Sequence, residues 1–150
     1  MKYMLDTNIC IYIIKEKPKK VLDKFQTCNI GDRMKVCSQT SWACPEEGQI
    51  CISMVTFAEL QYGVEKSQYK DKNQTALASF LGPIEILPFE QNAAIKYGSI
   101  RADLENQGRI RGAYDLMIAA HAIAENLILV TNNTKEFKRI TDLSLENWAK

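Results

Sequence analysis

Residues 3–16 read YMLDTNICIYIIKE, and this stretch decides the fold. Its apolar start ends at the acid Asp6, as is typical of a short buried strand. The apolar residues that follow predict a helix over 7–16, with Thr7 or Asn8 as its N-cap. A buried strand that leads directly into a helix is the repeating unit of an α/β domain.

Three further apolar runs predict strands at 49–53, 84–87 and 127–130, with a last strand near 143–145. The segments between them predict helices at 18–26, 55–67, 70–81, 90–107, 114–125 and 134–139. This alternation is typical of an α/β fold with a mainly parallel central sheet of four to five strands flanked by helices. We expect residues 1–150 to form a single domain, with a loop insertion at about 28–48, where periodicity is weak.

The composition excludes several classes of protein. The 150 residues carry 19 Lys and Arg against 18 Asp and Glu, a net charge of +1, which argues against coating nucleic acid by bulk charge. The single histidine, His121, excludes a multi-histidine metal site. No signal peptide and no run of roughly 18 apolar residues is seen, so we expect a cytoplasmic protein with no membrane contact.

Five cysteines are spread over the first third of the chain without a C-x-x-C pair. Zinc modules usually contain such a pair, because two ligands on one turn preorganise half of the site. Chance clustering is therefore the favoured interpretation, and a zinc or redox role is the alternative. Cys10 and Cys51 lie in apolar runs and resemble small core residues.

Three acids occupy unusual places. Asp6 follows the first strand, Glu59 lies in the helix after the second, and Asp115 opens the helix before the fourth. Ligands of open α/β sheets bind beyond the carboxyl ends of the strands, so these acids point to one edge. Taken singly, each acid could instead cap a helix, favour a helix dipole or pair with a lysine.

Two of these acids stand among uncharged residues. Glu59 is the only charge between positions 55 and 64, and Asp115 shares a helix face with Ile118 and Ala122, which should face the core. Burying a carboxylate is costly unless it is paired or holds a metal. Oxygen ligands without histidine favour Mg²⁺ or Mn²⁺ over zinc, and the natural chemistry is metal-assisted phosphodiester hydrolysis.

Four segments surround these acids: LDTNICIY at 5–12, ISMVTFAEL at 52–60, GAYDLMIAAHA at 112–122 and LVTNNTKEF at 129–137. In order, they resemble the four signature segments of PIN-domain ribonucleases, and more narrowly those of the VapC toxins of bacterial type II toxin–antitoxin modules. The resemblance covers nearly the whole chain outside about 28–48 and implies a PIN-like fold.

The resemblance also implies roles for individual residues. Asp6, Glu59 and Asp115 match the metal-binding carboxylates, and either Asp6 or Glu59 could orient the attacking water. Asn133 stands where the family often has a fourth acid. The following match polar positions around the carboxylates or lie nearby, with plain capping or turn roles as the alternative: Thr7, Asn8, Ser53, Thr131 and Glu136.

The function that the resemblance implies is a Mg²⁺-dependent endoribonuclease toxin, with Mn²⁺ as a substitute. Relatives cut structured RNA such as tRNA, form homodimers and are neutralised by a VapB-type antitoxin. The alternatives are a non-toxic PIN nuclease in RNA processing and an inactive PIN-like module that binds RNA or protein.

Basic residues cluster on three segments and are candidates for contacting RNA phosphates. Solvated helix faces are the alternative interpretation. The candidates are Lys15, Lys17, Arg109, Arg111, Lys135 and Lys138.

Overall fold

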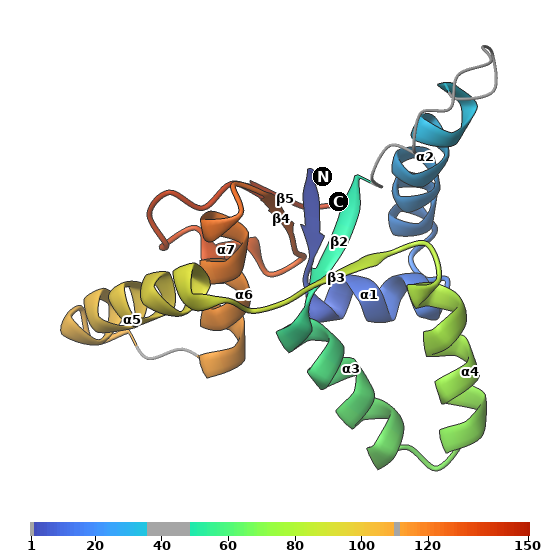
Figure 1. The fold of residues 1–150 in the computed structure, drawn as a ribbon, viewed down its shortest axis with the longest axis horizontal. Helices are drawn as coiled ribbons and strands as arrows, with labels where there is room; N and C mark the ends of the chain where they lie inside the picture. The colour runs from blue at the N-terminus through green and yellow to red at the C-terminus, as the bar shows by residue number, and fades with distance from the viewer. Residues whose placement is uncertain (1, 36–48, 110–111) are drawn as a thin grey trace.

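The fold is built on a parallel sheet. The computed structural model describes residues 2–35, 49–109 and 112–150. Within these ranges, five strands lie in the order β3-β2-β1-β4-β5, and every neighbouring pair is parallel (Figure 1). The strands are β1 (Tyr3–Leu5), β2 (Ile50–Ser53), β3 (Glu85–Leu87), β4 (Ile128–Val130) and β5 (Leu145–Glu146). The predicted α/β class with a parallel central sheet is confirmed.

Helices connect the strands and cover both faces of the sheet (Figure 1). No helix in the described part of the chain is long and apolar enough to cross a membrane. The helices are α1 (Thr7–Ile14), α2 (Lys19–Lys35), α3 (Met54–Lys66), α4 (Lys70–Leu81), α5 (Gln91–Asn106), α6 (Ala113–Ala124) and α7 (Thr134–Phe137).

One predicted boundary is wrong. The helix predicted to end at position 26 continues to Lys35, so the irregular interpretation fails for 27–35. Apolar periodicity marks only the part of α2 that packs on the core, at Val21 and Phe25, whereas a helical backbone can continue through polar residues. Positions 36–48 lie outside the described residues, so the loop insertion stays a prediction there.

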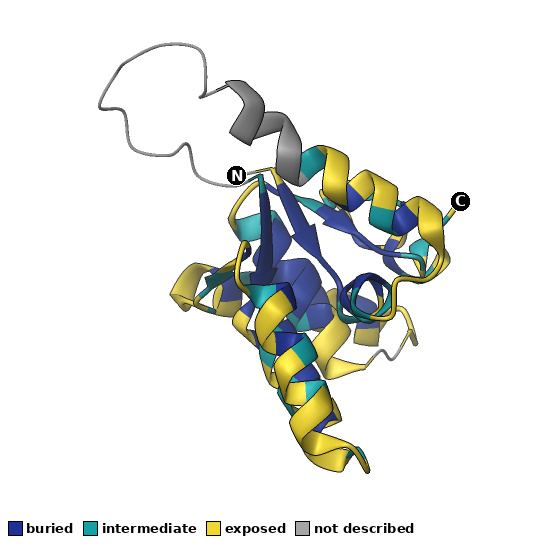
Figure 2. Ribbon diagram, turned by 90° about the vertical axis from the view of Figure 1, so that its right-hand side faces the viewer, coloured by how far each residue is buried: buried dark blue, intermediate teal, exposed yellow. Residues whose placement is uncertain are grey.

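The strands separate two hydrophobic cores by simple alternation. Leu5, Ile52 and Val130 face the core beneath α1 to α4, whereas Met4 and Leu129 face the core beneath α5 to α7. Figure 2 shows these strands as buried ribbons between exposed helix faces. Because a strand reverses its side chains at every residue, strands of only three residues can serve both cores.

The central strand fixes the position of a ligand site. Strand β1 pairs with β2 on one side and β4 on the other. The chain first builds outward through β2 and β3, and then crosses over to place β4 on the opposite side of β1. The order therefore reverses between β1 and β4, and ligands of open α/β sheets bind at such a reversal.

A buried hydrogen bond joins α3 to α6. The hydroxyl of Ser53 caps α3 by accepting from the Val55 N–H at 3.2 Å, and it lies 2.8 Å from Nδ1 of His121 on α6. Nε2 of His121 is buried without a hydrogen-bond partner among the described residues. Burial lowers the pKa of His121, against the raising effect of Glu125 and Glu90. The ring is therefore neutral near neutral pH and ties the two helices together.

The free energy of unfolding should fall as the pH drops from about 7 toward about 5, through the ordinary histidine range. The pKa of His121 is lower in the folded chain than in the unfolded chain, so the unfolded chain binds the extra proton and gains stability in acid. We expect His121→Asn to flatten this slope, whatever its absolute stability. Urea unfolding at a series of pH values measures the slope, and equal slopes for the two proteins would contradict the prediction.

Truncation of a fully buried strand residue should destabilise the fold. Leu129→Ala removes a side chain with no exposed surface, and we expect a loss of about 2–5 kcal/mol in the free energy of unfolding. Ile128→Ala, at a partly exposed position of the same strand, is the matched control and should cost clearly less. Chemical denaturation of both variants measures the difference; losses of equal size would argue against this placement of the core.

Candidate active site

Asp6 lies at the reversal point between β1 and β4. Its side chain is buried, and Oδ1 accepts a hydrogen bond from the backbone N–H of Asn8 at 2.7 Å. Asp6 is thus the N-cap of α1, and the prediction of Thr7 or Asn8 in that role is wrong. Oδ2 accepts a hydrogen bond from the hydroxyl of Thr131, the residue that follows β4. The pKa of Asp6 is raised, chiefly by burial, although these two hydrogen bonds act to lower it. The carboxylate is thus held rigidly in a place where its charge is unfavourable.

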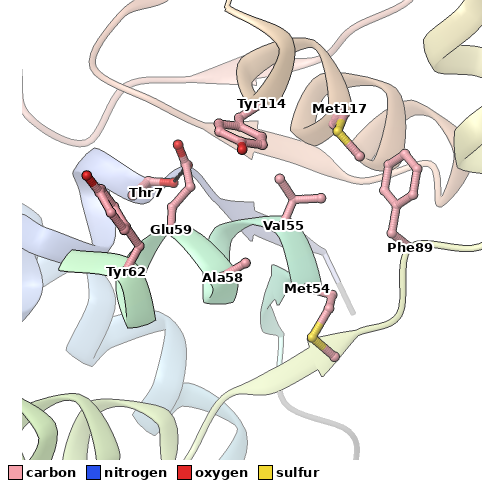
Figure 3. Close-up of a pocket in the computed structure, with 9 residues that line it drawn as sticks. All are labelled: Thr7, Met54, Val55, Ala58, Glu59, Tyr62, Phe89, Tyr114 and Met117. Carbon is pink, nitrogen blue, oxygen red and sulfur yellow. Dashed lines mark hydrogen bonds between the residues drawn. The ribbon is translucent and has the colours of Figure 1, made fainter. Parts of the chain in front are cut away.

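Glu59 comes to the same region from α3. It is half-buried, and its Oε2 accepts a hydrogen bond from the hydroxyl of Thr7, which follows Asp6 in the chain (Figure 3). Since α3 begins immediately after β2, Glu59 lies in the second turn beyond the carboxyl end of that strand. The Thr7 contact connects the ends of β1 and β2.

Asp115 lies in the first turn of α6, where the helix dipole favours an acid. The sequence predicted that it would share the core-facing side with Ile118 and Ala122. Those two residues are buried, but Asp115 is exposed, so the prediction of a buried carboxylate is wrong. The first turn of α6 extends beyond the packed core. A stripe of apolar residues in the sequence does not show where the packing of other elements against the helix ends.

Asp115 and Glu59 both lie near enough to Asp6 for their charges to act on it. The charges of Asp115 and Glu59 both raise the pKa of Asp6. None of the ion pairs between described residues includes Asp6 or Glu59. A cation would relieve this repulsion, and an all-oxygen donor set suits a hard divalent ion.

The acids do not form a ready-made cage. In the described ranges, no three His, Cys, Asp or Glu side chains are grouped so that they could hold a metal by themselves. The arrangement fits an ion held by one or two carboxylates with water completing its shell, which is the usual mode for a small hard dication in proteins.

The other predicted polar residues divide into two groups. Thr7, Thr131 and the backbone N–H of Asn8 bind the carboxylates, as described above. Ser53 instead caps α3 and contacts His121, while Asn133 has an exposed side chain and donates its backbone N–H to the Thr131 hydroxyl at 3.1 Å. Glu136 is half-buried on α7.

The predicted basic residues are exposed where the structure describes them. Lys15 lines a groove between α1, α3 and α4 that Glu59 also lines. Lys17, Arg109, Lys135 and Lys138 are also exposed, and position 111 lies outside the described residues.

The thiols of the two buried cysteines are not free to ionise at neutral pH. Cys10 and Cys51 are buried, as predicted, and burial raises the pKa of both, to about 12 for Cys51. They therefore remain protonated core residues. Cys28 is partly buried, and positions 37 and 44 lie outside the described residues.

A groove beside Glu59 was missed in the sequence. This aromatic groove, of about 790 Å³, runs between α3 and the start of α6 (Figure 3). The tyrosines at its edges are strongly exposed, Tyr62 at 65% and Tyr114 at 60%. The only available signal was an aromatic residue directly before Asp115. The groove is lined by Thr7, Glu59, Tyr62, Phe89, Tyr114 and Met117, among others.

A second contact that was not predicted from the sequence lies directly after Thr131. The amide of Asn132 donates to the hydroxyl of Tyr12 at 2.7 Å, joining the loop after β4 to α1. Neither residue type stands out at its position in the sequence, so no local signal predicted the pair.

Comparison with known proteins gives consistent matches over the whole chain. A model of the PIN domain matches residues 3–143. Ribonuclease VapC2 of Rickettsia felis is 45% identical over 150 residues, covering 100% of both chains. The tRNA(fMet)-specific endonuclease VapC of Shigella flexneri is 42% identical over 149 residues, covering 99% of each.

Solved structures agree with these matches. VapBC2 from Rickettsia felis, bound to a DNA fragment from its promoter, matches with a TM-score of 0.82 at 45% identity, covering 99% of each chain. DNA-bound VapBC from Salmonella typhimurium also gives 0.82, at 38% identity, covering 99% of this chain and 98% of that one. With the acids of three segments gathered at the reversal point of the sheet, the chain belongs to the PIN-domain family and, within it, to the VapC ribonucleases.

Proposed function

We propose that this chain is the endoribonuclease toxin of a type II toxin–antitoxin pair. It hydrolyses phosphodiester bonds of structured RNA and is held inactive by a VapB-type antitoxin. The observation that carries the proposal is the meeting of Asp6, Glu59 and Asp115 at the carboxyl edge of the sheet. Relatives named as tRNA(fMet)-specific endonucleases, at 38% and 42% identity, support tRNA as the substrate class. The VapBC complexes support the antitoxin, and a homodimer stays a prediction.

Asp6 and Asp115, with Glu59 beside them, would hold Mg²⁺, and Mn²⁺ would substitute for it. When bound, the ion supplies Lewis-acid chemistry: it activates water as a nucleophile and stabilises charge on the leaving oxygen. Without the ion, the same three carboxylates would repel the phosphate that they must approach.

The remaining groups orient these acids. Thr131 and the Asn8 N–H fix both oxygens of Asp6, so that this carboxylate does not rotate. Thr7 occupies Oε2 of Glu59, which leaves Oε1 to take a proton from the attacking water. Lys15, which shares a groove with Glu59, would neutralise a neighbouring phosphate of the RNA.

The other basic residues predicted from the sequence would add contacts of the same kind. Phosphate contacts position the RNA without reading its sequence, so each should contribute to binding and not to the chemistry. They are Lys17, Arg109, Arg111, Lys135 and Lys138.

Asp6→Asn should abolish cleavage while preserving the fold. The amide keeps the size of the side chain and can still accept from the Asn8 N–H, but it removes the charge that would hold the ion. We expect a loss of about 100-fold or more in the cleavage rate of an initiator tRNA transcript with Mg²⁺, and no cleavage by either protein in EDTA. Gel assays measure the rates, with circular dichroism as the test of folding.

Asp71→Asn is the matched control, because Asp71 is an exposed acid in the first turn of α4 and lines neither groove at Glu59. It should cleave at the wild-type rate. Wild-type cleavage by Asp6→Asn would refute the assigned site.

Induction of the wild-type chain should stop the growth of a bacterial host, because uncontrolled RNA cleavage blocks translation. Glu59→Gln should be harmless, and co-expression of a cognate VapB-type antitoxin should restore growth. Growth curves with and without that partner give the readout. An active purified nuclease that leaves growth unaffected would instead indicate a non-toxic RNA-processing enzyme.

A further inference from the structure

The aromatic groove has a chemistry of its own. Tyr62 on α3 and Tyr114 on α6 lie on the two sides of Glu59, and their rings are largely exposed (Figure 3). Single exposed aromatics are common on protein surfaces, but exposed apolar side chains gathered around one groove mark a binding site. Phe89 is held differently, since its ring packs edge-on against His121 with centroids 5.5 Å apart. The groove thus has a fixed inner wall and two largely exposed tyrosines at its edges.

The charges around the groove indicate which part of an RNA would enter it. Among the residues that the structure describes, Glu59 is the only charged one that lines the groove, so these residues would repel a phosphate but not the flat face of a neutral base. Outside, the amino group of Lys66 lies 5.9 Å from the ring centre of Tyr62, where it could neutralise the adjoining phosphate. An apolar interior with a cation outside suits a nucleotide that inserts its base.

We propose that the aromatic groove is a subsite for an unpaired nucleobase next to the cleaved bond, with Tyr62 and Tyr114 as its stacking surfaces. This inference rests on the proposed function. Glu59 and Thr7 belong to both the groove and the cluster of acids, so a base in the groove brings its own phosphate to the carboxylates. Aromatic side chains are the usual platforms for unpaired bases of RNA loops.

The occupant should be RNA and not a second protein surface. A copy of this chain seated permanently in the groove would cover Glu59 and block the substrate. The lining offers few hydrogen-bonding groups besides Thr7 and Glu59, so the groove should recognise the area of a stacked ring and not the identity of the base. The subsite would therefore select unpaired loops over duplex RNA.

Tyr62→Ala and Tyr114→Ala should each raise the KM for the initiator tRNA transcript about tenfold, with a smaller effect on kcat. Tyr62→Phe and Tyr114→Phe should retain the wild-type KM, because the ring face is kept. Tyr69→Ala is the matched control: Tyr69 is 69% exposed but lies outside the groove, and its loss should leave KM unchanged.

An abasic nucleotide next to the cleaved bond should raise KM for the wild type and add nothing in the Tyr62→Ala and Tyr114→Ala variants. Unchanged KM values in these variants, or a full abasic effect that persists in them, would overturn the subsite. Alanine variants that cut RNA normally but no longer bind the antitoxin or a second copy would also overturn it, and would assign the groove to a protein partner.

A binding measurement separates this subsite from the proposed function. A single-stranded RNA carrying 2-aminopurine is titrated with the protein in Ca²⁺ instead of Mg²⁺, so that the carboxylates are neutralised and binding is measured without a need for cleavage. Fluorescence should be quenched by the wild type and by Tyr69→Ala, but not by Tyr62→Ala. Quenching by a protein that cuts no RNA would uphold the subsite and refute the nuclease; cleavage without quenching would do the reverse.

Discussion

The burial of one carboxylate at the end of the central strand is the constraint on which the site depends. Asp6 follows β1, the middle strand of the five, and its side chain is buried. Its charge is desolvated, and two further acids raise its pKa. Such a group persists only if something else holds it in place and if its charge is useful.

The surrounding structure supplies that support from several directions. The start of α1, the end of β4 and the hydroxyl of Thr7 all take part in hydrogen bonds to the acids. The Ser53–His121 bond then joins α3 and α6, the helices that carry Glu59 and Asp115. The single histidine of the chain therefore has a structural role: it connects the helices that carry two of the acids while remaining uncharged.

Much of this was predictable from sequence, for physical reasons. The β1–α1 unit can be predicted because its apolar residues end abruptly at an acid that can cap a helix. Parallel strands place their carboxyl ends together, so Asp6 and Glu59 could be assigned to one edge without coordinates. The four family segments added the identity of the acids.

The rest depended on where the packed core ends. Periodicity placed Asp115 on a buried face, but it cannot show that the first turn of α6 extends past the elements that pack on this helix. The length of α2 was missed because a polar helix leaves no apolar pattern. The aromatic groove joins residues from α1, α3 and α6 with Phe89, and only the tertiary structure brings them together.

The central claim is that Asp6 and Asp115, with Glu59 beside them, hold a divalent cation. Diffraction from a crystal soaked in Mn²⁺, recorded at the manganese absorption edge, tests it directly. The account predicts an anomalous difference peak between the carboxylates of Asp6 and Asp115, on the side of Glu59. No peak there at saturating Mn²⁺, or peaks only at acids elsewhere on the surface, would contradict it.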